Sequence, residues 1–100
     1  MVKVTRAIAQ GWLADVPQEK VFWCSDGRIL KNLLELGDTL KQMSEETFCY
    51  HSNEAKSDFS NWVRDVIGDE KLAEDLKKSL TPAQAAKSVA DRVAWLKGKI

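Results

Sequence analysis

The residues best able to do chemistry lie in one stretch, TFCYHSNEAKSDFSNWVRDVIGD, which spans residues 47–69. It holds a thiol, an imidazole and a carboxylate in Cys49, the single histidine His51, and Asp58. These residue types can form a cysteine nucleophile with its base or, with Cys24 as a further ligand, a zinc site. The alternative is a joint between two helices that is held by polar contacts.

Spacing and charge argue against a reactive centre. On a helix, Cys49 and His51 would point about 200° apart, and structural zinc sites usually contain closer pairs such as C-x2-C. A catalytic thiol also needs an electropositive setting, whereas Glu45 and Glu46 lie close to Cys49. We therefore expect no metal, no cofactor and no catalytic residue, with both thiols buried as small apolar side chains. A thiol or metal site at Cys24, Cys49 and His51 is the weakest alternative.

A structural role for the polar side chains is favoured. If the chain bends at Ser52-Asn53, His51 ends one helix and Asp58 begins the next, so the two can pair across the joint. Aromatic neighbours would pack around the histidine with their polar tips satisfied. The predicted structural or functional cluster consists of Tyr50, His51, Asp58, Phe59 and Trp62.

The elements that position this cluster begin with an N-terminal helix and a hairpin. Apolar residues at helical spacing predict an amphipathic helix within residues 1–17, which docks on its own domain or, alternatively, binds a partner. The run VFWCSDGRIL predicts a β-hairpin with a two-residue Asp-Gly turn. That register would place Cys24 opposite Ile29 and Trp23 opposite Leu30.

Capping signals and apolar stripes divide the rest of the chain into helices. Glu35 completes a capping box, Gly68 suits the left-handed position after a helix, and Gly37 predicts the close approach of another backbone. The predicted N-caps are Asn32, Ser44, Asp69 and Thr81. The stripes predicted to be buried are Leu33, Leu36, Leu40 and Met43; Ala55, Phe59, Trp62, Val63, Val66 and Ile67; Leu72, Ala73, Leu76 and Leu80; and Val89, Val93 and Leu96, with Ile100 as an optional last member.

These patterns predict a mainly α fold with about five short helices and an N-terminal β-hairpin. The chain has 100 residues, 44% of them hydrophobic and 30% charged, which suits a single compact α+β domain over residues 1–100. Within it we distinguish the helix of residues 1–17, a core of hairpin and helices at 21–80, and a basic helix at 81–100.

Slightly more than half of the chain carries an ordered series of motifs: an aromatic strand, Asp-Gly, LxxLxEL, Tyr-His, DFxxW and GDxxLA. In this order they resemble a small prokaryotic domain family, frequent in archaea, whose function is unknown. The matching residues are Phe22, Trp23, Asp26, Gly27, Leu30, Leu33, Glu35, Leu36, Phe48, Tyr50, His51, Asp58, Phe59, Trp62, Gly68, Asp69, Leu72 and Ala73. Ser57 stands where that family has Asn, so no amide role is implied there. The resemblance implies no activity, cofactor or catalytic residue.

Charge and cysteine content limit the classes of partner and compartment. Fifteen basic residues balance fifteen acidic ones, so no global field draws the chain to nucleic acid or to an anionic membrane. Nucleic-acid binding through the basic C-terminal helix is an alternative function. Two cysteines without a signal peptide or a long apolar segment predict a cytoplasmic protein with reduced thiols and no membrane contact. The candidate basic surface is Lys87, Arg92, Lys97 and Lys99.

Tryptophan content indicates the function that we favour. Four tryptophans in 100 residues is a high number, and tryptophan is enriched at interface hot spots. The candidate interface is Trp12, Leu13 and Trp95. We therefore expect a non-enzymatic protein-interaction, assembly or regulatory module with a protein partner, including itself as a homodimer through the terminal helices.

Overall fold

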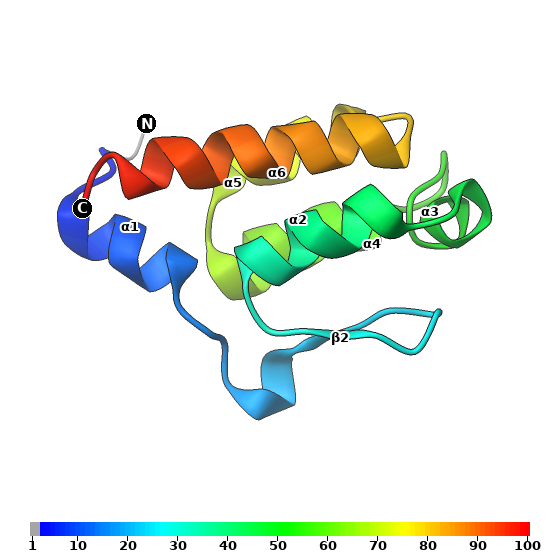
Figure 1. Cartoon of the computed structure of the whole chain (residues 1–100), viewed down its shortest axis with the longest axis horizontal. Helices are drawn as coiled ribbons and strands as arrows, with labels where there is room; N and C mark the ends of the chain where they lie inside the picture. Colours follow the sequence, from blue (N-terminus) through cyan, green and yellow to red (C-terminus); the bar gives the residue numbers. More distant parts are fainter. Residues whose placement is uncertain (1–2) are drawn as a thin grey trace.

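Helices α2 (Leu33–Gln42) and α6 (Pro82–Lys97) lie side by side and make the most extensive contact in the fold, as the computed structural model of residues 3–100 shows (Figure 1). Gly37 permits this approach, since a Cβ atom there would lie 3.1 Å from Cγ1 of Val89. Close packing at Gly37 is thus confirmed, but the neighbour is a side chain of α6 and not the backbone that was predicted.

The other elements complete a mainly helical globule around this pair, which confirms the predicted fold class. Residues 3–100 contain six α-helices, and none of their helices is long and apolar enough to span a membrane. The remaining helical elements are α1 (Arg6–Leu13), a 3-10 turn η1 (Gln18–Lys20), α3 (Glu45–His51), α4 (Asp58–Trp62), a π-helical segment η2 (Val63–Ile67) and α5 (Glu70–Lys78).

Side-chain caps fix where most of these helices begin. The side-chain oxygen of Asn32 accepts the N–H of Glu35 at 2.8 Å, and Glu35 in turn accepts the N–H of Lys31 at 3.0 Å. Gly68 has a φ of 99° and ends η2 in the left-handed region that favours glycine. The predicted caps at Ser44, Asp69 and Thr81 each accept a backbone N–H of the helix that follows.

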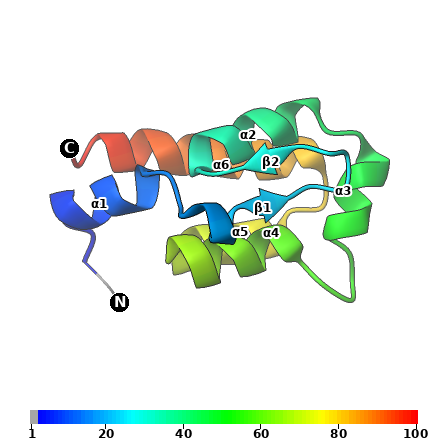
Figure 2. The same ribbon diagram turned by 90° about the horizontal axis from the view of Figure 1, so that it is seen from below.

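The hairpin pairs β1 (Phe22–Trp23) with β2 (Ile29–Leu30), but not in the predicted register. Phe22 lies opposite Leu30 and Trp23 lies opposite Ile29, so the prediction was wrong by one residue. In the observed register Phe22 and Leu30 are buried, whereas Trp23 and Ile29 face outward. Figure 2 shows the hairpin covering one side of α2 and α4.

A three-residue loop explains the shift. The N–H of Cys24 donates to the carbonyl of Arg28 at 2.9 Å, which closes the loop one residue earlier than a two-residue turn would. Only Gly27 has a positive φ among the loop residues, whereas the expected turn needs one at both of its central residues. Asp26 instead accepts the N–H of Arg28 through its carboxylate at 3.1 Å.

Three residues of the predicted stripes are exposed, and one of them is Ile100, which follows α6 and is 50% exposed. Ala55 lies in the loop before α4, because Ser52 and Ser57 form a β-bridge and the helix begins only at Asp58. Leu80 follows the end of α5 and is 81% exposed. The N-terminal helix is also shorter than residues 1–17, and residues 1–2 lie outside the described part of the chain.

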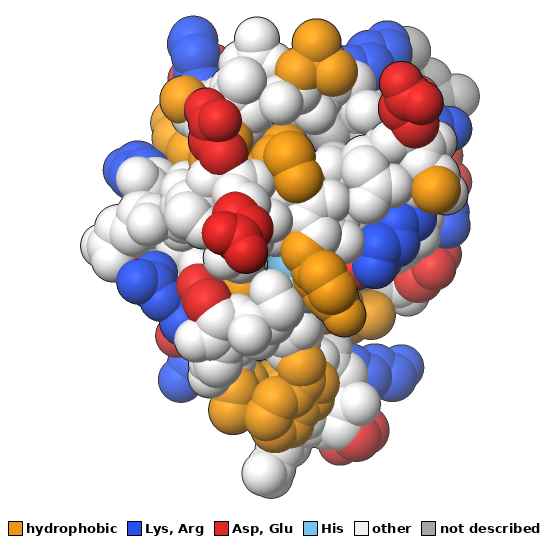
Figure 3. Space-filling model, turned by 90° about the vertical axis from the view of Figure 1, so that its right-hand side faces the viewer, with side chains coloured by type: hydrophobic (Ala, Val, Ile, Leu, Met, Phe, Trp, Pro, Cys, Tyr) orange, Lys and Arg blue, Asp and Glu red, His pale blue; other side chains and the backbone are white. Residues whose placement is uncertain are grey.

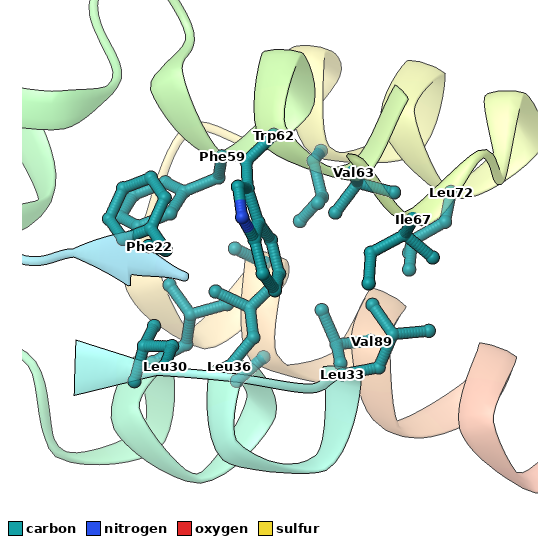
Figure 4. Close-up of a cluster of buried hydrophobic side chains, with 14 of the residues drawn as sticks. Phe22, Leu30, Leu33, Leu36, Phe59, Trp62, Val63, Ile67, Leu72 and Val89 are labelled. Atoms are coloured by element: carbon teal, nitrogen blue, oxygen red, sulfur yellow. The ribbon is translucent and has the colours of Figure 1, made fainter. Parts of the chain in front are cut away.

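The hydrophobic core lies between the hairpin and the helices (Figure 4). Each large side chain that is fully buried contributes about 1.5–3 kcal/mol relative to an exposed one. The labelled core residues are Phe22, Leu30, Leu33, Leu36, Phe59, Trp62, Val63, Ile67, Leu72 and Val89.

Candidate functional site

His51 links three segments of the chain. It is the last residue of α3 and is only 4% exposed. Its Nδ1 lies 2.9 Å from Oδ2 of Asp58, and its Nε2 accepts the backbone N–H of Ser25 at 2.9 Å. The predicted pairing of His51 with Asp58 across a helix joint is confirmed. The contact with Ser25 in the hairpin loop was not predicted, because it depends on how the hairpin packs.

The partners of His51 assign its tautomer. A backbone amide can only donate, so Nε2 must be the unprotonated nitrogen. The proton of a neutral imidazole then lies on Nδ1, where it is donated to Asp58. Both ring nitrogens of His51 are therefore satisfied by groups of the protein itself.

The solvent side of this pair is covered by Tyr50 and Lys56. The ammonium of Lys56 lies 3.1 Å from Oδ2 of Asp58 and 4.7 Å from the centre of the Tyr50 ring. Tyr50 meets His51 edge to face, with 5.0 Å between ring centres, as the prediction of aromatic packing requires. Its side chain is 61% exposed, however, so Tyr50 belongs to the surface of the cluster.

The inner side of His51 is the aromatic core. Phe22 and Phe59 lie 5.2 and 5.3 Å from the imidazole centre. Trp62 packs against Phe22 and donates its indole N–H to the carbonyl of Lys20 at 2.8 Å. Helix α4 is thus joined to β1 by aromatic contacts and to the end of η1 by a hydrogen bond.

This geometry suits a clamp better than a proton relay. A general base needs a lone pair within reach of a substrate proton, but the lone pair of His51 accepts the Ser25 amide inside the protein. The imidazole is also covered by Tyr50, Phe22 and Phe59. What the arrangement does is hold the hairpin loop against α3 and α4.

The two thiols lie in different surroundings. Cys24 follows β1 in the hairpin and is buried, whereas Cys49 is exposed, so the expectation that both are buried was wrong for Cys49. Burial raises the pKa of the Cys24 thiol, and the nearby Asp26 carboxylate adds to this, which keeps the thiol protonated and weakly nucleophilic. Across residues 3–100, no three His, Cys, Asp or Glu side chains converge in a way that could hold a metal ion.

The candidate interface residues at the chain ends are partly used within the molecule. Helix α1 packs against α6 and α2, which confirms docking on its own domain, and Trp12 and Leu13 are half-buried there. Trp95 is 44% exposed and lies between two cations, with Arg92 at 4.3 Å and Lys99 at 4.6 Å from its ring centre.

The candidate basic surface is smaller than the sequence indicates. Arg92 donates from Nε and Nη2 to the carboxylate of Asp69 at 2.7 and 3.0 Å, and that carboxylate is fully buried. Lys87 pairs with Asp91 at 3.0 Å. Of the four predicted basic residues, Lys97 and Lys99 are the two that form no salt bridge within residues 3–100. Asp69 was predicted as a cap, but nothing in the sequence connects it with Arg92.

Comparison with protein-family models, curated proteins and solved structures finds no match for this chain. The resemblance to the archaeal domain family therefore stays a prediction.

Proposed function

We propose that the protein is a small non-enzymatic assembly module that binds a second copy of itself through the outer face of its hairpin. The observation that carries this proposal is Trp23, which is 70% exposed and stands directly opposite Ile29, itself 50% exposed. In Figure 3, a group of apolar side chains projects at the lower edge of the molecule, where the hairpin lies. Tryptophan is among the residues most enriched at interface hot spots.

The hairpin presents this pair in a fixed position. The buried Phe22 anchors the strand from beneath, and His51 holds the loop through the Ser25 amide. A surface that is ordered before binding loses less conformational entropy when it binds. The clamp at His51 thus supports binding indirectly, by positioning Trp23 and Ile29.

Charge favours a second copy as the partner. The rim of the hairpin carries two pairs of opposite charges, Asp26 with Arg28 at 3.7 Å and Asp15 with Lys31 at 3.9 Å. The whole chain has a formal net charge of zero, so two copies approach without overall repulsion. A two-fold axis through the face would bring Trp23 of each copy onto Ile29 of the other, as an isologous interface requires.

Sedimentation velocity over a concentration series tests this proposal. The apolar face is small, so we expect a weak dimer that grows with concentration and is lost in the double variant Trp23→Ser, Ile29→Thr. Leu80→Ser is the matched control, because Leu80 is even more exposed but lies away from the hairpin. A parent protein that stays monomeric at its highest soluble concentration, or a Trp23→Ser, Ile29→Thr variant that dimerises as the parent does, would contradict the proposal.

The nucleic-acid alternative has less support. Arg92 pairs with Asp69 and Lys87 pairs with Asp91, which leaves few free cations on α6 for phosphate contacts.

We further propose a cytoplasmic location, which is supported by two cysteines that form no disulfide.

A further inference from the structure

A cleft of about 690 Å³ lies beside α3, away from the hairpin. One wall is formed by Cys49 of α3 and the loop at residues 52–57. The second wall comes from α4 and η2, and the third from the end of α5 with Leu80. Its volume falls within the range of small-molecule sites, roughly 300–1,000 Å³.

Three side chains on the walls have N–H groups that are free to donate into this cleft. The ammonium of Lys77 forms no salt bridge with a carboxylate of residues 3–100. The Arg64 guanidinium bonds Asp65 and Asn61 through Nε and Nη2, which leaves Nη1 free. Asn61 uses its amide oxygen in that contact and keeps its NH₂ group for a ligand. Arginine, lysine and amide nitrogen donate and do not accept, so the ligand must supply acceptors.

Ser57 adds a second, independent indication of a ligand. Among the buried side-chain nitrogen and oxygen atoms of residues 3–100, its Oγ is the one that has no hydrogen-bond partner. Ser57 belongs to the cleft wall, next to Asn61 on the same helical face. Buried hydroxyl groups are normally paired, and this Oγ has almost no accessible surface, so it meets a ligand oxygen in the cleft only after the Ser57 side chain rotates toward it.

The charges that line the cleft favour an anion. Three cations contribute to the lining, Lys56, Arg64 and Lys77, against the single carboxylate of Glu54. Lys56 is already paired with Asp58 at 3.1 Å, so Arg64 and Lys77 are the residues that remain for a ligand. The Arg64–Asp65 pair is exposed on both sides and therefore competes weakly.

We infer that this cleft binds the oxyanion of a small organic molecule, a phosphate or carboxylate group attached to an apolar body. Lys77 and Arg64 hold the oxyanion, with hydrogen bonds from Asn61 and Ser57. Arginine presents paired donors that match either group, and lysine supplies a point charge. The cleft is larger than an oxyanion alone, and the exposed side chain of Leu80 gives the apolar body a surface to cover.

Phenyl phosphate and benzoate test this inference, because they carry the two oxyanions on the same apolar body. Cys49 is a built-in reporter, since its thiol is exposed in the cleft wall while Cys24 is buried. We expect at least one of the two compounds to slow alkylation of Cys49 by iodoacetamide in a saturable way. Chemical shifts of the Ser57 and Asn61 amides, followed by NMR, should change with the same dissociation constant.

Variants separate a specific site from general binding. Lys77→Gln and Arg64→Gln should each weaken binding roughly tenfold, as loss of a charge-assisted hydrogen bond predicts. Lys71→Gln is the matched control, because Lys71 lies on the same helix but pairs with Asp75 at 2.7 Å outside the cleft. Equal urea midpoints for the three variants would establish that folding is intact.

The outcomes are distinct. Protection by phenyl phosphate alone assigns a phosphate ester, protection by benzoate alone assigns a carboxylate, and protection by both leaves the oxyanion as the shared feature. The inference is overturned if neither compound protects Cys49 or shifts the Ser57 and Asn61 signals. It is equally overturned if protection is the same in Lys77→Gln, Arg64→Gln and the parent. None of these results depends on whether the hairpin mediates dimerisation.

Discussion

Arg92 and Asp69, 23 residues apart, form a two-pronged ion pair whose carboxylate is fully buried. The same carboxylate accepts the N–H of Leu72 and so caps α5. The Arg92 side chain also lies against the ring of Trp95, with the ring of Trp12 farther away at 5.8 Å. One arginine therefore connects the start of α5, helix α6 and the docked helix α1.

Arg92→Gln should destabilise the fold strongly, because it leaves the carboxylate of Asp69 buried without its cation. Breaking such a pair from one side costs about 3–5 kcal/mol. Lys87→Gln removes a cation from the same helix, but its pair with Asp91 is exposed and should contribute less than about 1 kcal/mol. Urea denaturation followed by circular dichroism measures both variants. Equal midpoints for Arg92→Gln and Lys87→Gln would refute this account.

His51→Ala should destabilise the fold and loosen the hairpin. The variant leaves a cavity between Phe22 and Phe59 and deprives the Ser25 amide of its acceptor, which together should cost about 2–4 kcal/mol. Hydrogen exchange should show the Ser25 amide losing protection before the amides of α6 do. Cys49→Ala, an exposed change in the same helix, is the control. A His51→Ala variant that unfolds as the parent does but no longer dimerises would show that the clamp is not structural.

The Cys24 thiol should make stability fall at alkaline pH. Its folded pKa is raised above the ordinary value of 9.0, mainly by burial. Above that value the unfolded chain loses the proton first and so binds fewer protons than the folded state, which means that stability decreases as pH rises. Urea midpoints from neutral pH to pH values above 9.0 should fall less steeply in Cys24→Ala than in the parent or in Cys49→Ala. Identical slopes in all three proteins would disprove this contribution.

Local signals in the sequence predicted most of the fold, and contacts between distant segments account for what was missed. The caps at Asn32, Asp69 and Thr81 depend on neighbours within three residues, and all three were predicted. The His51–Asp58 pair spans a single bend, so the spacing of the two residues was enough to predict it. By contrast, the partner of Arg92 is set by how α5 packs on α6.

The hairpin register shows a different limit of prediction from the sequence. An Asp-Gly pair fits a two-residue turn, but it also fits a three-residue loop that ends in a left-handed glycine. The two alternatives differ by one residue and exchange the faces of the strands. Burial of Phe22 and Leu30 against the aromatic core decides between them, and this core exists only in the folded protein. The exposed pair of Trp23 and Ile29, which carries the proposed function, could not be identified before the register was known.

A substitution at Gly27 therefore tests the three-residue conformation of the hairpin loop. Its φ of 95° is strained for any residue with a Cβ atom, so Gly27→Ala should cost about 1–2 kcal/mol although nothing crowds the site. Gly11 is the matched control, because it lies within α1 and also has open space around it. Gly11→Ala should stabilise the protein by up to about 1 kcal/mol through helix propensity. Urea midpoints that move in opposite directions would support the three-residue loop, whereas a Gly27→Ala variant as stable as the parent would argue against it.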